Sequence, residues 1–126
     1  MKRLWLGLVL LAAMLSLGIW ENIRIPALTE PIAQSLEEAA QAALAGSWET
    51  AAKKTDAARQ CWLDGWDLLA STTHHGPMEE IDGLLAKAEL LLQSRSGADF
   101  SACCSRLAEM VRALGEAHKV NLRNLL

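Results

Sequence analysis

The sequence predicts an all-α protein in which one N-terminal transmembrane helix is followed by a small antiparallel four-helix bundle. Three observations lead to this fold class. The chain opens with an unbroken apolar run from Leu4 to Trp20. Helix-favouring Ala and Leu dominate the rest of the chain, whereas Tyr is absent and Phe occurs once. Apolar residues after the run recur at spacings of three and four, which is typical of one helix face.

The N-terminal run is predicted to anchor the chain in a membrane. Its seventeen residues, Leu4 to Trp20, would form a helix of about 25 Å, at the short end of what crosses a bilayer. Trp5 and Trp20 lie near its two ends, where indole rings favour the membrane–water interface. Lys2 and Arg3 precede the run, so we expect a cytoplasmic N-terminus and an extracytoplasmic remainder.

A cleaved signal peptide is the competing interpretation of the same residues, because its basic start and apolar run would look alike. Ser16 and Gly18 are small enough to precede a cleavage site, although Ile19 and Trp20 continue the apolar run. We therefore divide the chain into an anchor or signal peptide over residues 1–25 and an extracytoplasmic helical domain over residues 26–126.

The first two helices of the domain are delimited by proline and glycine. Pro26 should break the helix that leaves the membrane, because proline lacks an amide donor and disfavours helix at the preceding residue. Thr29 is suited to cap a new helix, which Gly46 should end. Ser47 can cap a second helix that fades near residues 71–73.

The third and fourth helices follow a second set of signals. Gly76-Pro77 marks a corner, with Pro77 suited to a first helical position. The acids Glu79, Glu80 and Asp82 would lie in the first turn, where negative charge suits the helix dipole. After a polar loop over residues 93–98, Asp99 can cap a last helix that runs almost to Leu126.

The residues expected to face the core are Ile32, Leu36, Ala39, Ala40, Ala43, Leu44, Trp48, Ala51, Ala52, Thr55, Ala58, Trp62, Trp66, Leu69, Met78, Ile81, Leu84, Leu85, Ala88, Leu91, Leu92, Phe100, Cys103, Leu107, Met110, Val111, Leu114, Ala117 and Leu122.

One hairpin corner resembles that of a tetratricopeptide repeat. The segment Ala42-x-Leu44-x-Gly46-x-Trp48-x-x-Ala51 combines a corner glycine, an aromatic residue that packs back and an alanine where helices approach. Because only one such corner is clear, tetratricopeptide-like hairpins remain an option within the bundle and a repeat array is weakly supported.

The charge of the chain argues against nucleic acid as a partner. All fifteen acids but only ten of the twelve Lys and Arg residues follow Trp20, so this part carries a formal charge of −5. A nucleic-acid surface needs a basic face that neutralises phosphates. An acidic domain also lacks a peripheral grip on anionic lipid, so contact with the bilayer is expected through the N-terminal helix.

The three cysteines allow at most one intrachain disulfide. Cys61 could pair with Cys103 or Cys104 if their helices pack together. The favoured alternative treats all three as small apolar residues in or near the core. Cys103 and Cys104 lie early in the last predicted helix, a position that would lower a thiol pKa, but no histidine is near in sequence to complete a nucleophilic site.

Other polar clusters are weaker candidates for chemistry. His74 and His75 with Glu79 and Glu80 form the best metal candidate, although consecutive histidines cannot easily bind one ion from a regular helix, and the third histidine, His118, lies far along the chain. Asp64 and Asp67 are one turn apart but flanked by solvent-facing residues. We expect no catalytic residue and no cofactor, and hence no enzyme.

The second half of the chain resembles a known family. A tryptophan-rich helix with Trp62 leads into His75 and the acidic corner Glu79–Asp82, and the chain ends in Asn121–Leu126. With the N-terminal anchor and this chain length, the pattern is similar to the bacterial domain of unknown function DUF4363 family. That resemblance implies a membrane-anchored helical protein and carries no assigned activity.

Two functions fit these observations. The first is a non-enzymatic accessory protein of the bacterial cell membrane, whose extracytoplasmic bundle binds another membrane protein or itself, with Glu79, Glu80 and Asp82 as candidate interaction residues. The second is an extracytoplasmic module that binds a small ligand or metal, using Trp62, Trp66 or the paired histidines. For the tryptophans, packing in the core is the simpler interpretation of their spacing.

Overall fold

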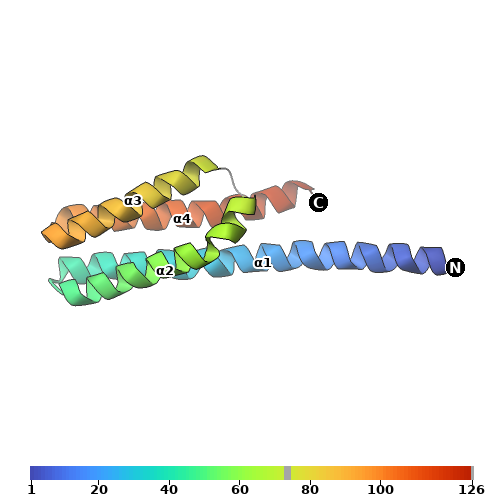
Figure 1. Ribbon diagram of the computed structural model, residues 1–126, viewed down its shortest axis with the longest axis horizontal. Helices are drawn as coiled ribbons and strands as arrows, with labels where there is room; N and C mark the ends of the chain where they lie inside the picture. The colour runs from blue at the N-terminus through green and yellow to red at the C-terminus, as the bar shows by residue number, and fades with distance from the viewer. Residues whose placement is uncertain (73–74, 126) are drawn as a thin grey trace.

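The computed structural model describes the backbone of residues 1–72 and 75–125, and the side chains of residues 1–17, 27–70 and 76–117. Over this part of the chain the protein is all-α, as predicted. Figure 1 shows its four helices, which are α1 (Lys2–Leu44), α2 (Trp48–Thr72), α3 (His75–Ser94) and α4 (Gly97–Leu125).

The helices pack as an up-down-up-down bundle (Figure 1). α1 lies between α2 and α4 and packs extensively on both, while α3 packs mainly on α4. α2 and α3 close the ring but contact each other least. The α1–α2 and α3–α4 corners lie at one end of the bundle, and the N-terminal part of α1 projects from the other end (Figure 1).

α1 is one continuous helix, so the break predicted at Pro26 is wrong. The helix runs from Lys2 to Leu44 through Pro26 and Pro31, and it joins the predicted anchor to the first bundle helix. Thr29, expected at a helix start, is therefore an interior residue. One interior proline costs a helix about 3 kcal/mol. The buried face that follows it outweighs this cost, because Ile32 and Leu36 are almost completely enclosed.

The α1–α2 corner closes as the glycine signal predicts. Gly46 has a φ of +82°, a left-handed conformation that side chains disfavour. The Ser47 N–H donates to the Ala42 carbonyl at 2.8 Å, and the Gly46 N–H donates to the Ala43 carbonyl at 3.1 Å. These two bonds form a Schellman motif, which satisfies carbonyls left free at the end of α1.

The α3–α4 corner uses the same motif without glycine. The Ser96 N–H donates to the Leu91 carbonyl at 3.2 Å, the Arg95 N–H donates to the Leu92 carbonyl at 3.3 Å, and Arg95 has a φ of +53°. The connection is therefore only residues 95–96, shorter than the predicted loop over residues 93–98. α3 also begins at His75, two residues before the predicted first position at Pro77.

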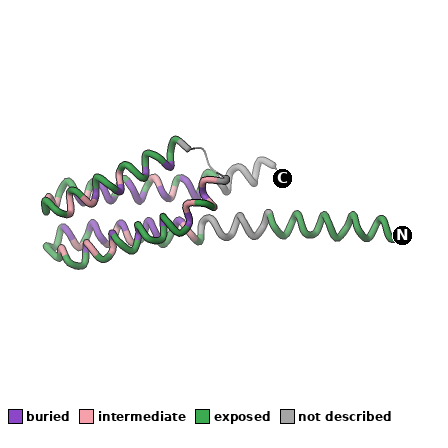
Figure 2. The backbone as a smooth tube through the Cα atoms, in the orientation of Figure 1, coloured by how far each residue is buried: buried purple, intermediate pink, exposed green. Residues whose placement is uncertain are grey.

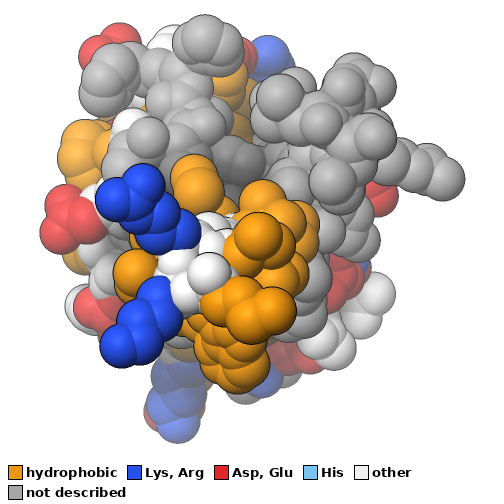
Figure 3. All heavy atoms as spheres, turned by 90° about the vertical axis from the view of Figure 1, so that its right-hand side faces the viewer, with side chains coloured by type: hydrophobic (Ala, Val, Ile, Leu, Met, Phe, Trp, Pro, Cys, Tyr) orange, Lys and Arg blue, Asp and Glu red, His pale blue; other side chains and the backbone are white. Residues whose placement is uncertain are grey.

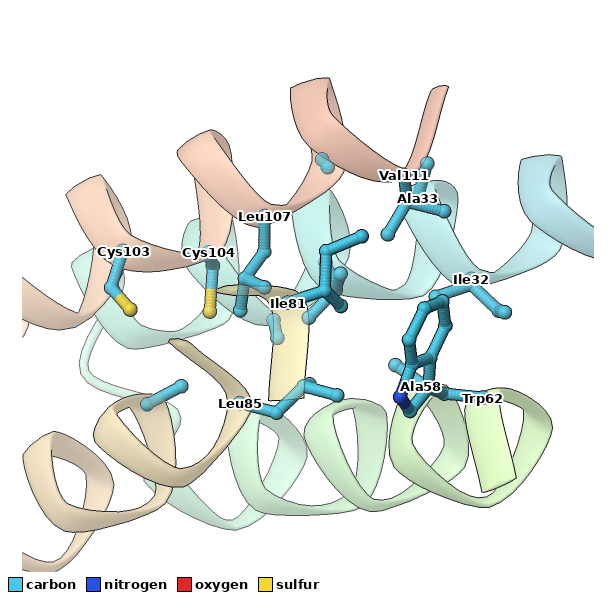
Figure 4. Close-up of a cluster of buried hydrophobic side chains, with 14 of the residues drawn as sticks. Ile32, Ala33, Ala58, Trp62, Ile81, Leu85, Cys103, Cys104, Leu107 and Val111 are labelled. Atoms are coloured by element: carbon cyan, nitrogen blue, oxygen red, sulfur yellow. The ribbon is translucent and has the colours of Figure 1, made fainter. Parts of the chain in front are cut away.

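The apolar faces predicted from spacing meet in one core. Figure 2 shows that the buried residues follow the inward faces of all four helices. In Figure 4, Trp62 from α2 lies among side chains of the other helices. Trp48 and Phe100 join the two corners, with ring centroids 6.0 Å apart and planes at 60°. Leu44 and Ala117 are exceptions, because both are exposed rather than buried, and Leu122 lies outside the described side chains.

Two glycines allow α2 and α4 to approach α1 closely at one level. A Cβ on Gly65 of α2 would overlap the side chain of Leu28, and a Cβ on Gly115 of α4 would lie 2.5 Å from the Thr29 hydroxyl oxygen. Neighbouring α1 residues are thus contacted from both sides where α1 enters the bundle.

The projecting part of α1 is apolar and exposed. Its large hydrophobic side chains between Leu4 and Leu17 are each 50–73% exposed. Figure 2 shows this segment as exposed along its length, and Figure 3 shows hydrophobic side chains gathered at this end of the molecule beside Lys or Arg side chains. Among the described residues, we find no helix with a stretch long and apolar enough to span a bilayer. The predicted anchor reaches Trp20, and residues 18–20 lie outside the described side chains.

Candidate functional site: the groove between α2 and α3

The groove where α2 faces α3 is the candidate site. Two cavities of about 210 Å³ and about 340 Å³ lie along this seam. Both are lined by Arg59 of α2 and Glu89 of α3, so they adjoin each other along the seam, and we call the two together the seam groove. Its lining mixes charged side chains with apolar ones such as Leu63 and Leu85. A surface of this mixed kind suits a protein ligand that offers both charge and apolar contact.

Two polar contacts cross the seam groove. The Trp62 indole N–H donates to Asp82 Oδ1 at 2.6 Å, and Arg59 Nη1 lies 2.7 Å from Glu89 Oε1. Trp62 is only 1% exposed, so the carboxylate supplies the partner that its buried N–H needs. We call the Trp62–Asp82 and Arg59–Glu89 pairs the seam clasp. It joins α2 to α3, which have few other contacts.

The three acids of the predicted corner have different surroundings. Asp82 belongs to the seam clasp, and Glu80 pairs with Arg106 of α4 at 3.3 Å. Glu79 is exposed and forms no ion pair with any residue the structure describes. The sequence pattern marked Trp62 and Asp82 separately, and only the fold brings them into contact.

The structure does not test the metal candidates, because both histidines lie outside the described side chains. No group of three or more His, Cys, Asp or Glu among the described side chains is arranged to hold an ion. His74 lies outside the described residues, and the side chain of His75, which begins α3, lies outside them as well. Asp64 and Asp67 are exposed on α2, in keeping with a solvated face.

The three thiols are free, and two of them are buried. Cys103 and Cys104 lie in the core as expected, whereas Cys61 is exposed, so the prediction of a core position is wrong for Cys61. Burial raises the pKa of Cys103 although the charges of Lys87 and Arg106 act to lower it, and burial raises the pKa of Cys104 to about 12. The expectation that the helix start would lower these pKa values is therefore wrong, because burial raises both of them.

An arginine that the sequence analysis did not single out links α4 to α1. Arg112 donates to Glu30 through Nη2 at 3.1 Å and to Glu37 through Nη1 and Nη2. This hydrogen bonding lowers the pKa of Glu37 and raises that of Arg112. The signal in the sequence is the seven-residue spacing of the two acids, which places them on one face of a helix. Their partner becomes visible only when α4 packs on α1.

The anchor candidates are partly described. Leu4 and Trp5 are exposed on the projecting part of α1, each at 73% of its full area. Trp20, at the other end of the predicted anchor, lies outside the described side chains.

A profile of the domain of unknown function DUF4363 matches residues 19–125. The chain belongs to the DUF4363 family. This confirms the resemblance drawn from the tryptophan helix, the acidic corner and the C-terminal residues. No curated protein and no solved structure matches the chain. In this DUF4363 protein, the whole seam groove lies within the matched residues, and most of the apolar run precedes them.

Proposed function

We propose that this DUF4363 protein is a membrane-anchored accessory protein. In this proposal Leu4–Trp20 is embedded in the lipid bilayer of a bacterial cell membrane, and the bundle outside the cytoplasm binds another membrane protein or a second copy of the chain. The observation that carries the proposal is the exposed apolar segment of α1. Burying one Leu side chain is worth about 1.5–3 kcal/mol, so a row of them exposed to water favours transfer into an apolar phase.

Charge supports the orientation of the proposed anchor. Lys2 and Arg3 flank the segment on its N-terminal side, as expected for a cytoplasmic N-terminus. The remainder carries all the acids of the chain, which suits a domain that contacts the bilayer through its anchor alone. The continuity of α1 supports a direct link between anchor and bundle, because no linker separates them.

Two measurements test the anchor. Alkaline extraction should leave the full chain in the membrane pellet, and replacing both Leu10 and Leu11 by Arg should release it, because charge at the centre of a span costs several kcal/mol. A reporter fused after Leu126 should be active outside the cytoplasm. Activity only in the cytoplasm, or a wild-type chain that stays in solution without detergent, would contradict the proposal.

The seam groove is the proposed binding surface. Of the helix pairs in contact, α2 and α3 contact each other least, which leaves room along their seam for side chains of a partner. Leu63 lines the groove and is 51% exposed, which makes it an apolar contact available to a partner. The charged residues around it supply specificity rather than affinity.

Crosslinking in intact membranes tests this surface. The wild-type chain should yield a stoichiometric protein partner or a homo-oligomer, and Leu63→Glu should remove that product. Leu90→Glu is the matched control, because Leu90 is similarly exposed at 66% and does not line the groove. A wild-type monomer without a partner overturns the accessory role, and equal loss in both variants overturns the assignment to the groove.

A further inference from the structure

A separate cavity of about 400 Å³ lies between α3 and α4. It shares no lining residue with the seam groove, so it is a distinct place on the bundle. Its apolar lining includes Leu84 and Leu91 of α3 and the buried Cys103 of α4. Its volume falls in the range of small-molecule sites, about 300–1,000 Å³.

Two cations from different helices converge on this cavity. Lys87 of α3 and Arg106 of α4 both line it, and both lie near enough to the Cys103 thiol for their charges to act on its pKa. Lys87 forms no ion pair with any described side chain. Arg106 bridges Glu80 at 3.3 Å, but both side chains are more than half exposed, and such surface pairs are weak.

The remaining charged lining residue is Asp99. It precedes Arg106 by seven residues on α4, about 10 Å along the helix, and therefore marks the other end of the cavity. The Cys103 thiol between these ends donates to the Leu84 carbonyl at 3.5 Å, and with its raised pKa it adds an uncharged wall.

We propose that this cavity binds a small monocarboxylic acid with an apolar body. The carboxylate lies between Lys87 and Arg106, where charge-assisted hydrogen bonds to a guanidinium are strong and directional. The apolar body lies against the leucines and the uncharged thiol. Asp99 disfavours a second negative charge at the far end, so a dicarboxylate binds less well. This site is independent of the anchor and of the seam groove.

NMR titration of the full chain in lipid nanodiscs tests the proposal, with empty nanodiscs as the control for partitioning. 3-Phenylpropionate should shift resonances of residues around the cavity and saturate. 3-Phenylpropionamide, which has the same body without the charge, and glutarate, which has two carboxylates, should each bind at least about tenfold more weakly. Equal binding of the acid and its amide, or no saturable shift with the acid, overturns the proposal.

Variants locate the site. Lys87→Gln and Arg106→Gln should each weaken 3-phenylpropionate binding by about tenfold, the loss expected for one charge-assisted hydrogen bond. Lys53→Gln is the matched control, because it removes an exposed, ion-paired cation of α2 that lines neither this cavity nor the seam groove, and it should bind like the wild type. Ala102→Phe should block binding by filling the cavity that Ala102 lines while keeping both cations. Unchanged binding in Ala102→Phe, or the same loss in Lys53→Gln, overturns the assignment.

Discussion

The Arg112 guanidinium offers a planar fork of donors, and it directs this fork at two carboxylates of α1. Glu30 and Glu37 repel each other on one helix face, and the cation of α4 compensates both. The contact is partly exposed, with side-chain exposures of 37% for Arg112 and 44% for Glu37. The contact therefore contributes little to the free energy of unfolding. We infer that its main effect is to fix the register of α4 against α1.

The lowered pKa of Glu37 predicts how stability depends on pH. The unfolded carboxyl takes up a proton near pH 4.5, whereas the folded one does so at lower pH. Its contribution to the free energy of unfolding is thus complete above about pH 4.5 and is lost as pH falls through the folded pKa. Urea unfolding at pH 6, 4.5 and 3 should show a smaller acid loss in Arg112→Gln than in the wild type. Identical pH profiles in the two proteins would show that the Glu37–Arg112 contact does not couple protonation of Glu37 to stability.

Gly115 and Gly83 predict opposite effects of the same substitution. Gly115→Ala should destabilise the fold by about 1–3 kcal/mol, because the added Cβ lies 2.5 Å from the hydroxyl oxygen of the β-branched Thr29. Gly83→Ala should stabilise it by about 0.5–1 kcal/mol, because nothing lies within 4 Å and alanine favours helix. Thermal or urea unfolding compares the two, and a stabilised Gly115→Ala variant would count against the close approach of α4 to α1.

The two hairpin corners share one backbone motif but differ in residue type. Arg95 adopts the left-handed conformation that Gly46 adopts at the other corner. That conformation costs a residue with a side chain about 1–2 kcal/mol, a cost that glycine avoids. Glycine also has more conformational freedom in the unfolded chain, which offsets part of this advantage. Arg95→Gly should therefore raise the free energy of unfolding by about 0.5–1 kcal/mol, and Gly46→Ala should lower it by about 1 kcal/mol. Urea midpoints that move the other way would contradict the motif.

Within the seam clasp, the buried donor is the Trp62 indole N–H, which Asp82 of α3 accepts. Asp82→Ala leaves the Trp62 N–H without its acceptor and should cost about 1–2 kcal/mol. Glu79→Ala, an acid one turn earlier on α3 with no ion pair to described residues, should change stability by less than about 0.5 kcal/mol. Chemical unfolding followed by tryptophan fluorescence measures the free energy of unfolding of both variants. Equal changes in the two would mean that the Trp62–Asp82 hydrogen bond does not stabilise the fold.

For the whole molecule, the core and the projecting segment are separate. Among the side chains that the structure describes, the buried ones lie between Thr29 and Gly115, and all of residues 1–17 are exposed. Deleting residues 1–17 should therefore leave a cooperatively folded helical bundle with a melting temperature within about 3 °C of the full chain, since no described core contact is removed. Circular dichroism checks this, and loss of the cooperative transition would mean that the projecting segment stabilises the bundle.

The core could be predicted from the sequence because burial on a helix follows its period. Spacing alone predicts that Trp62, Ile81 and Leu107 lie in the interior, and each is buried. Helix ends were harder, because they depend on competing local energies. Gly46 was predictable, since its conformation is open mainly to glycine, whereas Pro26 failed as a breaker because packing beyond it outweighs one lost hydrogen bond.

By itself the sequence determined the all-α class, the apolar faces, the apolar start and the family, because these depend on residue type and on spacing along the chain. Only the tertiary structure decided that Trp62 donates to Asp82, that Arg112 joins two acids of α1, and that Lys87 and Arg106 share a cavity. Each of these contacts joins residues of different helices. Local propensities do not determine which turns of two helices lie side by side. The close packing of whole helix faces sets this register.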